Sequence, residues 1–250
     1  MLGVESLLAA TLARLGAKPP DDASQATKKR YSERVSEAVA LVFAQELRER
    51  GMRGTRPLAH PTEEGSGAER RMAGGIGAKK VDVTWATEES GLLLGISVKS
   101  INFRDPRTGN FQKNLTNRRG DMLMEAVTLH RRFPYAVLAG FFFLDAGAAT
   151  DSTQNRDGSA RRRSTFLNAH ARMKLFTGRD DPAGRDEQYE RMYVLLLDTA
   201  PGEMTVRTTE VGRPDLPVPL SVTFDTLVTL VAERNPDFYE ALDGRIVTAS

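Results

Sequence analysis

The sequence predicts an α/β (α+β) fold with a central mixed β-sheet flanked by helices. Three observations predict it. Segments with helical apolar spacing recur along the chain, separated by short apolar strands. The 250 residues are 40% hydrophobic and 27% charged, which is enough apolar material for one sizeable core. Strands and helices mix through the whole length, and this favours one domain around a mixed sheet.

The elements of the first part of the chain follow from periodicity and from breaking residues. Leu2 to Leu15 have helical spacing and Gly16 ends that helix, while Ser24 is a candidate N-cap for the next. Two apolar runs around a polar, glycine-containing turn predict a β-hairpin. The expected elements are helices over 1–16 and 24–50, a short strand near 71–73, hairpin strands over 80–85 and 92–101, a helix over 118–132 and a buried strand over 135–144.

The second part adds helices and strands to the same sheet. Ser164 is a candidate N-cap, and Asn235-Pro236 breaks the last helix. We expect a polar loop over 145–163, a helix over 164–178, a strand over 192–198 with a partner over 204–211, a helix over 222–233 and a turn over 237–243. This divides the chain into an N-terminal helix or arm (1–20) and one domain (21–250), with a core over 24–145 and an elaboration over 146–250.

Composition excludes several classes of function. The absence of cysteine excludes disulfides, thiolate metal sites and thiol catalysis. The three histidines (His60, His130 and His170) have no metal-binding spacing, and His130 is interpreted as a charge at a helix end. The longest apolar run is about half of a bilayer span, so we expect a cytoplasmic protein without membrane contact. Arginine supplies 27 of the 35 basic residues, which suits phosphate partners and equally suits a GC-rich genome.

One set of polar residues on the predicted hairpin carries the functional argument. Ser97 and Lys99 are two residues apart on one strand and therefore share a face. Lys99 follows a mostly apolar run, and an ammonium there is costly without an anionic partner. Asp82, flanked by valines on the other strand, is the candidate partner. The set predicts a site for Mg²⁺ and a phosphate, with a structural ion pair as the alternative.

With Val81-Asp82 on one strand and Ser97-Val98-Lys99 on the next, the chain resembles the PD-(D/E)xK nucleases, which include many restriction endonucleases. The resemblance covers about residues 24–145. It implies a core of helix, three strands, helix and strand. It also implies a metal-dependent nuclease in which Asp82 and Lys99 match the motif's Asp and Lys. The motif's Pro is Val81 here, and its second acid is replaced by Ser97.

The missing acid leaves three explanations open, because a hydroxyl is a poor Mg²⁺ ligand. In the first, the acid has moved to the helix after the hairpin, as in a subset of type II restriction enzymes. Asp121 and Glu125, four apart on one helix face, are the candidates. In the second, the first helix supplies it through Glu37, which lies beside the apolar stripe, or through Glu33. In the third, the site is degraded and the domain only binds.

The resemblance also implies a mechanism. Asp82 and a helix acid would hold one or two Mg²⁺, or Mn²⁺ in its place, and the ion would lower the pKa of bound water. Lys99 would orient or help deprotonate that water and stabilise developing charge. The candidate catalytic residues are thus Asp82, Lys99, Ser97 and Glu37, and the candidate metal ligands are Asp82, Glu37, Glu125 and Asp121.

Two basic segments are candidate nucleic-acid contacts. One directly follows the Lys99 strand, and the other precedes a predicted helix. Arginine and lysine suit phosphates, while asparagine suits base edges. The candidate residues are Arg104, Arg107, Lys113, Asn114, Asn117, Arg118, Arg119, Arg161, Arg162 and Arg163.

Taken together, these features predict a Mg²⁺-dependent endonuclease of double-stranded DNA, in a restriction-modification or antiviral (phage) defence system. The two alternatives are a catalytically degraded nuclease fold acting as a DNA-binding or assembly subunit, and an unrelated α/β interaction domain. A homodimer would suit double-strand cleavage, and a defence effector could depend on partner proteins.

Overall fold

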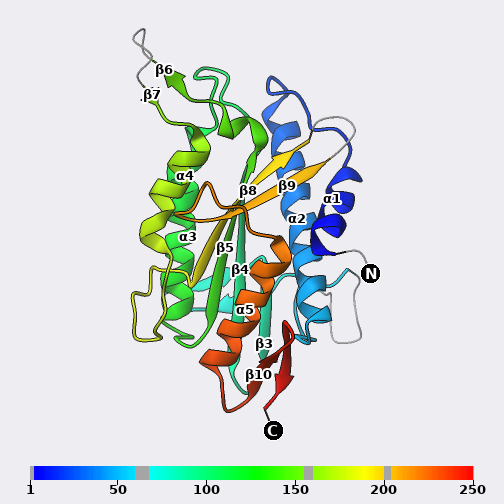
Figure 1. Cartoon of the computed structure of the whole chain (residues 1–250), viewed down its shortest axis with the longest axis vertical. Helices are drawn as coiled ribbons and strands as arrows, with labels where there is room; N and C mark the ends of the chain where they lie inside the picture. The colour runs from blue at the N-terminus through cyan, green and yellow to red at the C-terminus, as the bar shows by residue number, and fades with distance from the viewer. Residues whose placement is uncertain (1–2, 60–67, 155–159, 200–203, 250) are drawn as a thin grey trace.

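The computed structural model describes residues 3–59, 68–154, 160–199 and 204–249. Its centre is a five-stranded mixed sheet with helices on both faces (Figure 1), which confirms the predicted α/β class. No helix in the described ranges is long and apolar enough to cross a membrane. In sheet order, the strands are β3 (Val83–Thr87), β4 (Gly91–Ile101), β5 (Val137–Asp145), β8 (Arg191–Asp198) and β9 (Thr205–Glu210).

Parallel pairing in the middle of the sheet is what brings the helices onto its faces. β3 and β4 form the predicted antiparallel hairpin, β4, β5 and β8 are parallel, and β9 returns antiparallel to β8. α3 (Leu115–His130) connects β4 to β5, and α4 (Thr165–Met173) lies between β5 and β8. β5 is buried from Val137 to Leu144, as its apolar run predicts. Phe141 and Phe143 enter the core on one face of the sheet, and Phe142 enters the core on the other.

Three helices, α1 (Val4–Ala13), α2 (Gln25–Glu49) and α5 (Leu220–Arg234), contribute to the core on one face of the sheet. α3 and α4 contribute to the core on the other. The predicted caps are confirmed: Ser24 Oγ accepts from Thr27 N at 3.2 Å, and Ser164 Oγ accepts from Leu167 N at 3.3 Å. Leu8 of α1 is fully buried in the core that α2 lines, so α1 is packed as part of the domain.

The structure corrects three details. α3 begins at Leu115 and not at the expected position 118, and it directly follows the short 3-10 helix η1 (Gln112–Asn114). Asn117 therefore lies on the helix and not before it. The expected loop over 145–163 contains a 3-10 helix and a short strand before residues 155–159 and another short strand after them. The expected terminal turn is a hairpin. These elements are η2 (Ala146–Ala149), β6 (Thr153–Gln154), β7 (Ala160–Arg162), η3 (Lys174–Phe176) after α4, β10 (Tyr239–Leu242) and β11 (Arg245–Thr248).

The short strand expected near 71–73 is present as β1 (Arg71–Ala73), but it pairs with β2 (Ala78–Lys80) in a sheet of its own. The chain then continues through Val81 and Asp82 into β3. Between α2 and α3 the chain therefore has four strands, of which only β3 and β4 belong to the central sheet, whereas the resemblance implied three strands there.

Candidate functional site

The site lies where the edge strand of the sheet stops short of its neighbour. Pairing between β3 and β4 ends at Val83 opposite Ile96, so residues 97–101 of β4 extend beyond β3. Asp82 directly precedes β3, and its Oδ2 accepts a hydrogen bond from Val98 N at 2.6 Å. The carboxylate thus takes the place of a strand partner at the exposed edge of β4.

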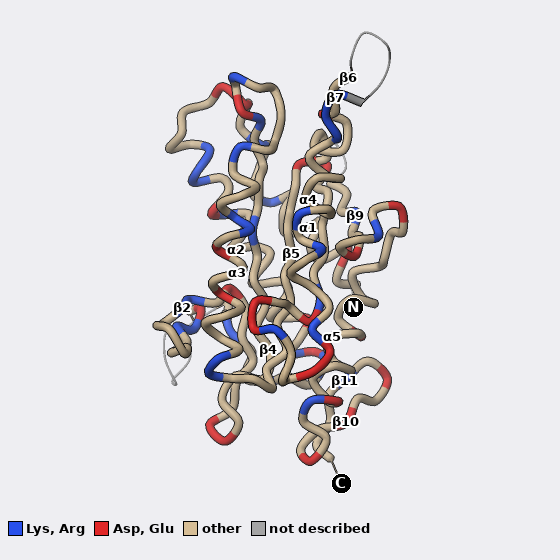
Figure 2. Tube along the Cα trace, turned by 90° about the vertical axis from the view of Figure 1, so that its left-hand side faces the viewer, with Lys and Arg blue, Asp and Glu red and all other residues tan. Residues whose placement is uncertain are grey.

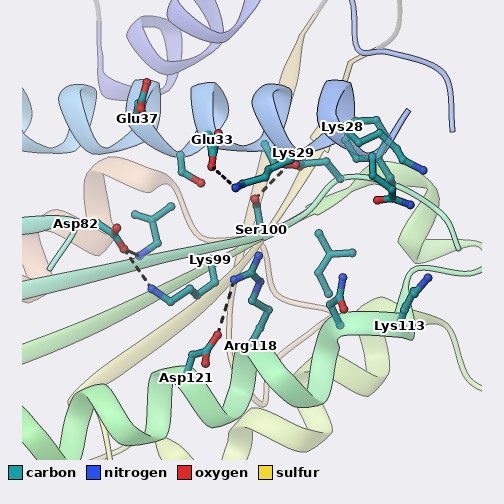
Figure 3. Close-up of a pocket in the computed structure, with 18 of the residues that line it drawn as sticks. Lys28, Lys29, Glu33, Glu37, Asp82, Lys99, Ser100, Lys113, Arg118 and Asp121 are labelled. Atoms are coloured by element: carbon teal, nitrogen blue, oxygen red, sulfur yellow. Dashed lines mark hydrogen bonds and ion pairs between the residues drawn. The ribbon is translucent and has the colours of Figure 1, made fainter. Parts of the chain in front are cut away.

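Lys99 lies between two carboxyl groups at this edge. Its Nζ is 3.5 Å from Asp82 Oδ2 and 3.4 Å from Glu125 Oε2, which α3 supplies from the other side of the site. Figure 3 shows the Lys99 side chain extending from the strand towards Asp82. The Lys99 and Asp82 side chains are 17% and 23% exposed, whereas that of Glu125 is only 7% exposed. We call Asp82, Lys99 and Glu125 the Lys99 cluster.

Burial and charge oppose each other in the Lys99 cluster. Burial acts to lower the pKa of Lys99, but the attraction of Glu125 and Asp82 outweighs it, and the pKa is raised. For Glu125, burial is the largest effect and raises the pKa of the carboxyl, although Lys99 acts against it. The Ser97 hydroxyl is buried and lowers the pKa of Glu125 as a polar neighbour, without a well-formed hydrogen bond to any described residue. The ammonium therefore stays charged, while Glu125 holds its proton more tightly than an ordinary glutamate.

A cavity of about 850 Å³ opens in front of the Lys99 cluster, between α2 and α3 (Figure 3). Acidic side chains occur both at its base and on its walls. Its basic lining comes from α2, the β1–β2 hairpin, β4, the segment after β4, and α3. These lining residues are Lys28, Lys29, Lys79, Lys80, Lys99, Arg104, Lys113 and Arg118.

The structure brings Glu125, and not Glu37, to Lys99. Glu37 is exposed on α2 and lines the same cavity, but among the described residues no ion pair or hydrogen bond joins it to the Lys99 cluster. Glu33 pairs with Lys29 at 3.7 Å on the same helix. Asp121, also on the cavity wall, is 58% exposed and pairs with Arg118 at 3.7 Å. From the sequence, Glu37 was preferred over Asp121 and Glu125. In the structure, Glu125 is the one of these three that lies next to Lys99.

The first basic segment is held in shape by its own contacts. Asp105 accepts from the backbone N–H groups of Arg107 and Thr108 and pairs with Lys113 at 2.8 Å. The Lys113 ammonium, as the largest influence, lowers the pKa of Asp105 to about 2. The Arg104 guanidinium lies 4.8 Å from the centre of the Phe111 ring.

The remaining basic candidates do not all face the cavity. Asn114 and Arg118 line it, whereas Arg119 is placed over the Phe176 ring at 5.6 Å. Asn117 is exposed on α3. The second basic segment is at the end of β7 and directly after it, outside the cavity lining. Arg161 and Arg163 are exposed, and Arg162 pairs with Asp151 at 4.0 Å.

The donor set fits a hard divalent cation held by few protein ligands. In the described ranges, no group of three or more His, Cys, Asp or Glu side chains is arranged to hold a metal ion. Two carboxyl groups, Asp82 and Glu125, nevertheless converge on one ammonium beside an open cavity. Mg²⁺ typically keeps several waters and binds through one or two carboxylates plus substrate phosphates. Asp82 and Glu125 are the residues that would hold it.

Sequence reasoning missed a second, fully enclosed ion cluster at the start of β8. Glu190 Oε1 is 3.0 Å from Arg179 Nη1 and 3.4 Å from Arg234 Nη2, and its Oε2 is 3.4 Å from His130 Nε2. We call these four residues the Glu190 cluster. His130 is the last residue of α3, as the sequence suggested for a helix-end group, but its side chain is buried against Glu190. The members are far apart in sequence, and no local motif marks them.

His170 does not line the cavity. His170 is buried on α4, where burial lowers its pKa to about 4 and its Nδ1 accepts from Gly212 N at 3.1 Å. His60 lies outside the described residues.

No protein-family model, curated protein or solved structure matches this chain. The Lys99 cluster and its cavity therefore have to be interpreted from their own geometry and chemistry.

Proposed function

We propose that the protein is a Mg²⁺-dependent endonuclease that hydrolyses phosphodiester bonds in double-stranded DNA. The observation that carries the proposal is the Lys99 cluster: one lysine shared by two carboxyl groups at the base of a cavity with lysine and arginine on its walls. Acidic groups there suit a hard cation, and the basic walls suit the phosphates on either side of it.

Each member of the cluster has a distinct role in this proposal. Asp82 and Glu125 hold the cation, with Mn²⁺ as a substitute for Mg²⁺. When bound, the ion neutralises charge on the scissile phosphate and lowers the pKa of a bound water. Lys99, released from one of its carboxyl partners, donates to a phosphate oxygen and orients the attacking water. The buried Ser97 hydroxyl lowers the pKa of Glu125.

The basic segments supply the remaining contacts in this proposal. Arg104, Lys113 and Arg118 bind phosphates in the cavity, and Asn114 reaches a base edge. Such an activity suits a cytoplasmic restriction or phage-defence nuclease. A homodimer would offer one site to each strand, and a defence partner could control access.

A second candidate function is nucleic-acid binding without cleavage. It is favoured by Ser97 at the position of the motif acid and by the absence of a three-carboxylate group among the described residues. Under this alternative, the Lys99 cluster is an ion pair that only maintains the edge of β4.

Cleavage of a panel of unmodified bacterial and phage DNAs, with Mg²⁺, with Mn²⁺ and with EDTA, tests the proposal. We expect metal-dependent cleavage by the wild type and its loss in Glu125→Gln and Lys99→Met. Glu187→Gln is the control, because it removes a carboxylate that does not line the cavity. Cleavage that survives both substitutions overturns the assigned site. A wild type that binds DNA but never cleaves it overturns catalysis and supports the second candidate.

A further inference from the structure

The β1–β2 hairpin forms one wall of the cavity. It is separate in sequence from the two basic segments. Its strands pair from Arg71 opposite Lys80 to Ala73 opposite Ala78. Lys79 and Lys80 line the same cavity as the Lys99 cluster. Figure 2 shows β2 as a projecting segment rich in basic residues near α3. The hairpin therefore brings two cations to the site directly before Asp82 in the chain.

Close glycine contacts fix the tip of this hairpin against α3. Gly75 N donates to Thr128 O at 2.8 Å, and Gly74 N donates to Gly77 O at 2.6 Å. A Cβ atom at Gly74 would overlap Thr128, and one at Gly75 would overlap Arg131. Only glycine permits this approach. Because α3 also carries Glu125, the tip of the hairpin and the buried acid of the site are held by the same helix.

The base of the hairpin is fixed as well. Val81 N donates to Arg70 O at 3.1 Å, and Arg70 Nη1 donates to Ala86 O of β3 at 3.2 Å. With both ends held, the hairpin presents Lys79 and Lys80 to the cavity without a large loss of backbone freedom on binding.

The charges on this wall are available to a ligand. Lys80 pairs with Glu69, and the Lys80 side chain is 70% exposed whereas that of Glu69 is only 17% exposed. Glu69 is also the main reason that the pKa of Lys80 is raised, so the ammonium remains charged. In the described part of the chain, no ion pair joins Lys79 to an acid. The exposed Lys80 ammonium is therefore accessible to an incoming phosphate, which would take the place of Glu69.

We propose that the β1–β2 hairpin is a phosphate-binding wall for double-stranded DNA, and that Glu69 is an internal counter-anion which the DNA backbone displaces. The inference rests on the proposed function, because it assigns a further part of the same substrate path. It differs from that function in depending on Lys79, Lys80 and Glu69, none of which belongs to the Lys99 cluster.

Fluorescence anisotropy of a labelled DNA duplex, in EDTA and over a series of salt concentrations, tests the inference without interference from cleavage. Lys79→Ala/Lys80→Ala should weaken binding and reduce the slope of log K against log salt by about 2, because each phosphate contact contributes about 0.9 to that slope. Glu69→Gln should strengthen binding. The matched control is Lys174→Ala/Arg213→Ala, which removes two exposed charges that do not line the cavity. Its slope should remain that of the wild type.

A third variant separates the position of the hairpin from its charge. Gly75→Val leaves both lysines in place but displaces the tip from α3, and we expect weaker binding with an unchanged thermal midpoint for the remaining domain. If the lysine variant and Glu69→Gln both bind like the wild type, the hairpin inference is overturned, while cleavage that depends on Glu125 still stands. If the wild type neither binds nor cleaves any DNA, the proposed function fails and the inference fails with it.

Discussion

The Lys99 cluster and the Glu190 cluster use the same kinds of groups in opposite proportions. In the Glu190 cluster, one carboxylate faces two guanidinium groups and a histidine, and it also accepts from Leu138 N at 2.7 Å. Backbone carbonyls hold the arginines: Arg179 donates to Pro134 O and Pro182 O, and Arg234 donates to Arg179 O. In the Lys99 cluster, one ammonium faces two carboxyls at 3.4–3.5 Å beside an open cavity.

The difference distinguishes an ionic group that holds the fold from one that can take a ligand. In the Glu190 cluster, fixed carbonyl oxygens accept hydrogen bonds from both guanidinium groups, although Arg179 Nε, Arg234 Nη1 and His130 Nε2 have no hydrogen-bond partner among the described residues. In the Lys99 cluster, the one backbone donor to a carboxyl group that the described residues supply is Val98 N, which donates to Asp82. A cation from solvent is the natural complement to the excess of carboxyl groups in the Lys99 cluster.

The largest expected effect is the loss of folding stability when the Glu190 cluster is broken. Glu190→Gln leaves two buried guanidinium groups without a counter-charge, and removing one partner of such a pair typically costs about 3–5 kcal/mol. Urea denaturation measures the free energy of unfolding. Glu187→Gln is the control, because it breaks the exposed pair with Arg185 nearby, which is worth at most about 1 kcal/mol. Equal stabilities of the two variants would mean that the Glu190 cluster does not hold the fold.

The second prediction reverses this pattern at the Lys99 cluster. Glu125→Gln should leave the free energy of unfolding unchanged or raise it, because burial already disfavours the charged carboxylate. If the proposed function is right, cleavage should fall by more than about 100-fold, since even residues outside the metal shell typically cost 10–100-fold. Denaturation and cleavage measured on the same preparation check both parts. A variant that unfolds readily but still cleaves would assign Glu125 to the fold instead.

The third prediction concerns pH. The pKa of Glu125 is raised above its ordinary value of 4.5, so the folded protein binds this proton more tightly than the unfolded chain does. The resulting stabilisation is present at low pH and is lost as the pH rises through the folded-state pKa. The stability of Glu125→Gln relative to the wild type should therefore be greater at about pH 8 than at about pH 4. Urea titrations at both values measure it, and a pH-independent difference would contradict the stated burial effect.

The sequence predicts a contact more reliably when the residues that form it are close together along the chain. The hairpin with Asp82 and Lys99 was predictable, because both strands, their turn and the facing residues lie within twenty positions. The β5 strand was predictable from its apolar run, and α2 and α4 from their caps and spacing. Glu125 could be named as a candidate but not selected over Glu37, because the choice depends on how the α3 crossover packs on the sheet.

Two other features show where the sequence signal was present or absent. The terminal hairpin has a signal that was overlooked: Asp243-Gly244 is a typical two-residue hairpin turn, and both residues have positive φ. The Glu190 cluster has none. Its members come from α3, α5 and the segment around β8, and only the tertiary fold brings a glutamate at 190 to arginines at 179 and 234. Long-range ionic contacts of this kind have no periodicity from which to predict them.

The smallest expected effects come from two neighbouring arginines on α3 that face different surroundings. Arg118 lines the cavity, whereas Arg119 lies 5.6 Å from the centre of the Phe176 ring and packs towards η3. Adjacent helix positions point about 100° apart, so the helix itself separates the two roles. Arg118→Ala should reduce the salt slope of DNA binding by about 1, as expected for one phosphate contact.

Arg119→Ala should leave that slope unchanged and lower the free energy of unfolding by about 0.5–1 kcal/mol, the usual value of an exposed cation–π contact. Anisotropy over a salt series and urea denaturation of both variants provide the four measurements. If both variants change the salt slope equally, DNA contacts a basic surface of α3 that extends beyond the residues lining the cavity. If only Arg118 does, the boundary between ligand-binding and fold-holding charge runs between two consecutive residues.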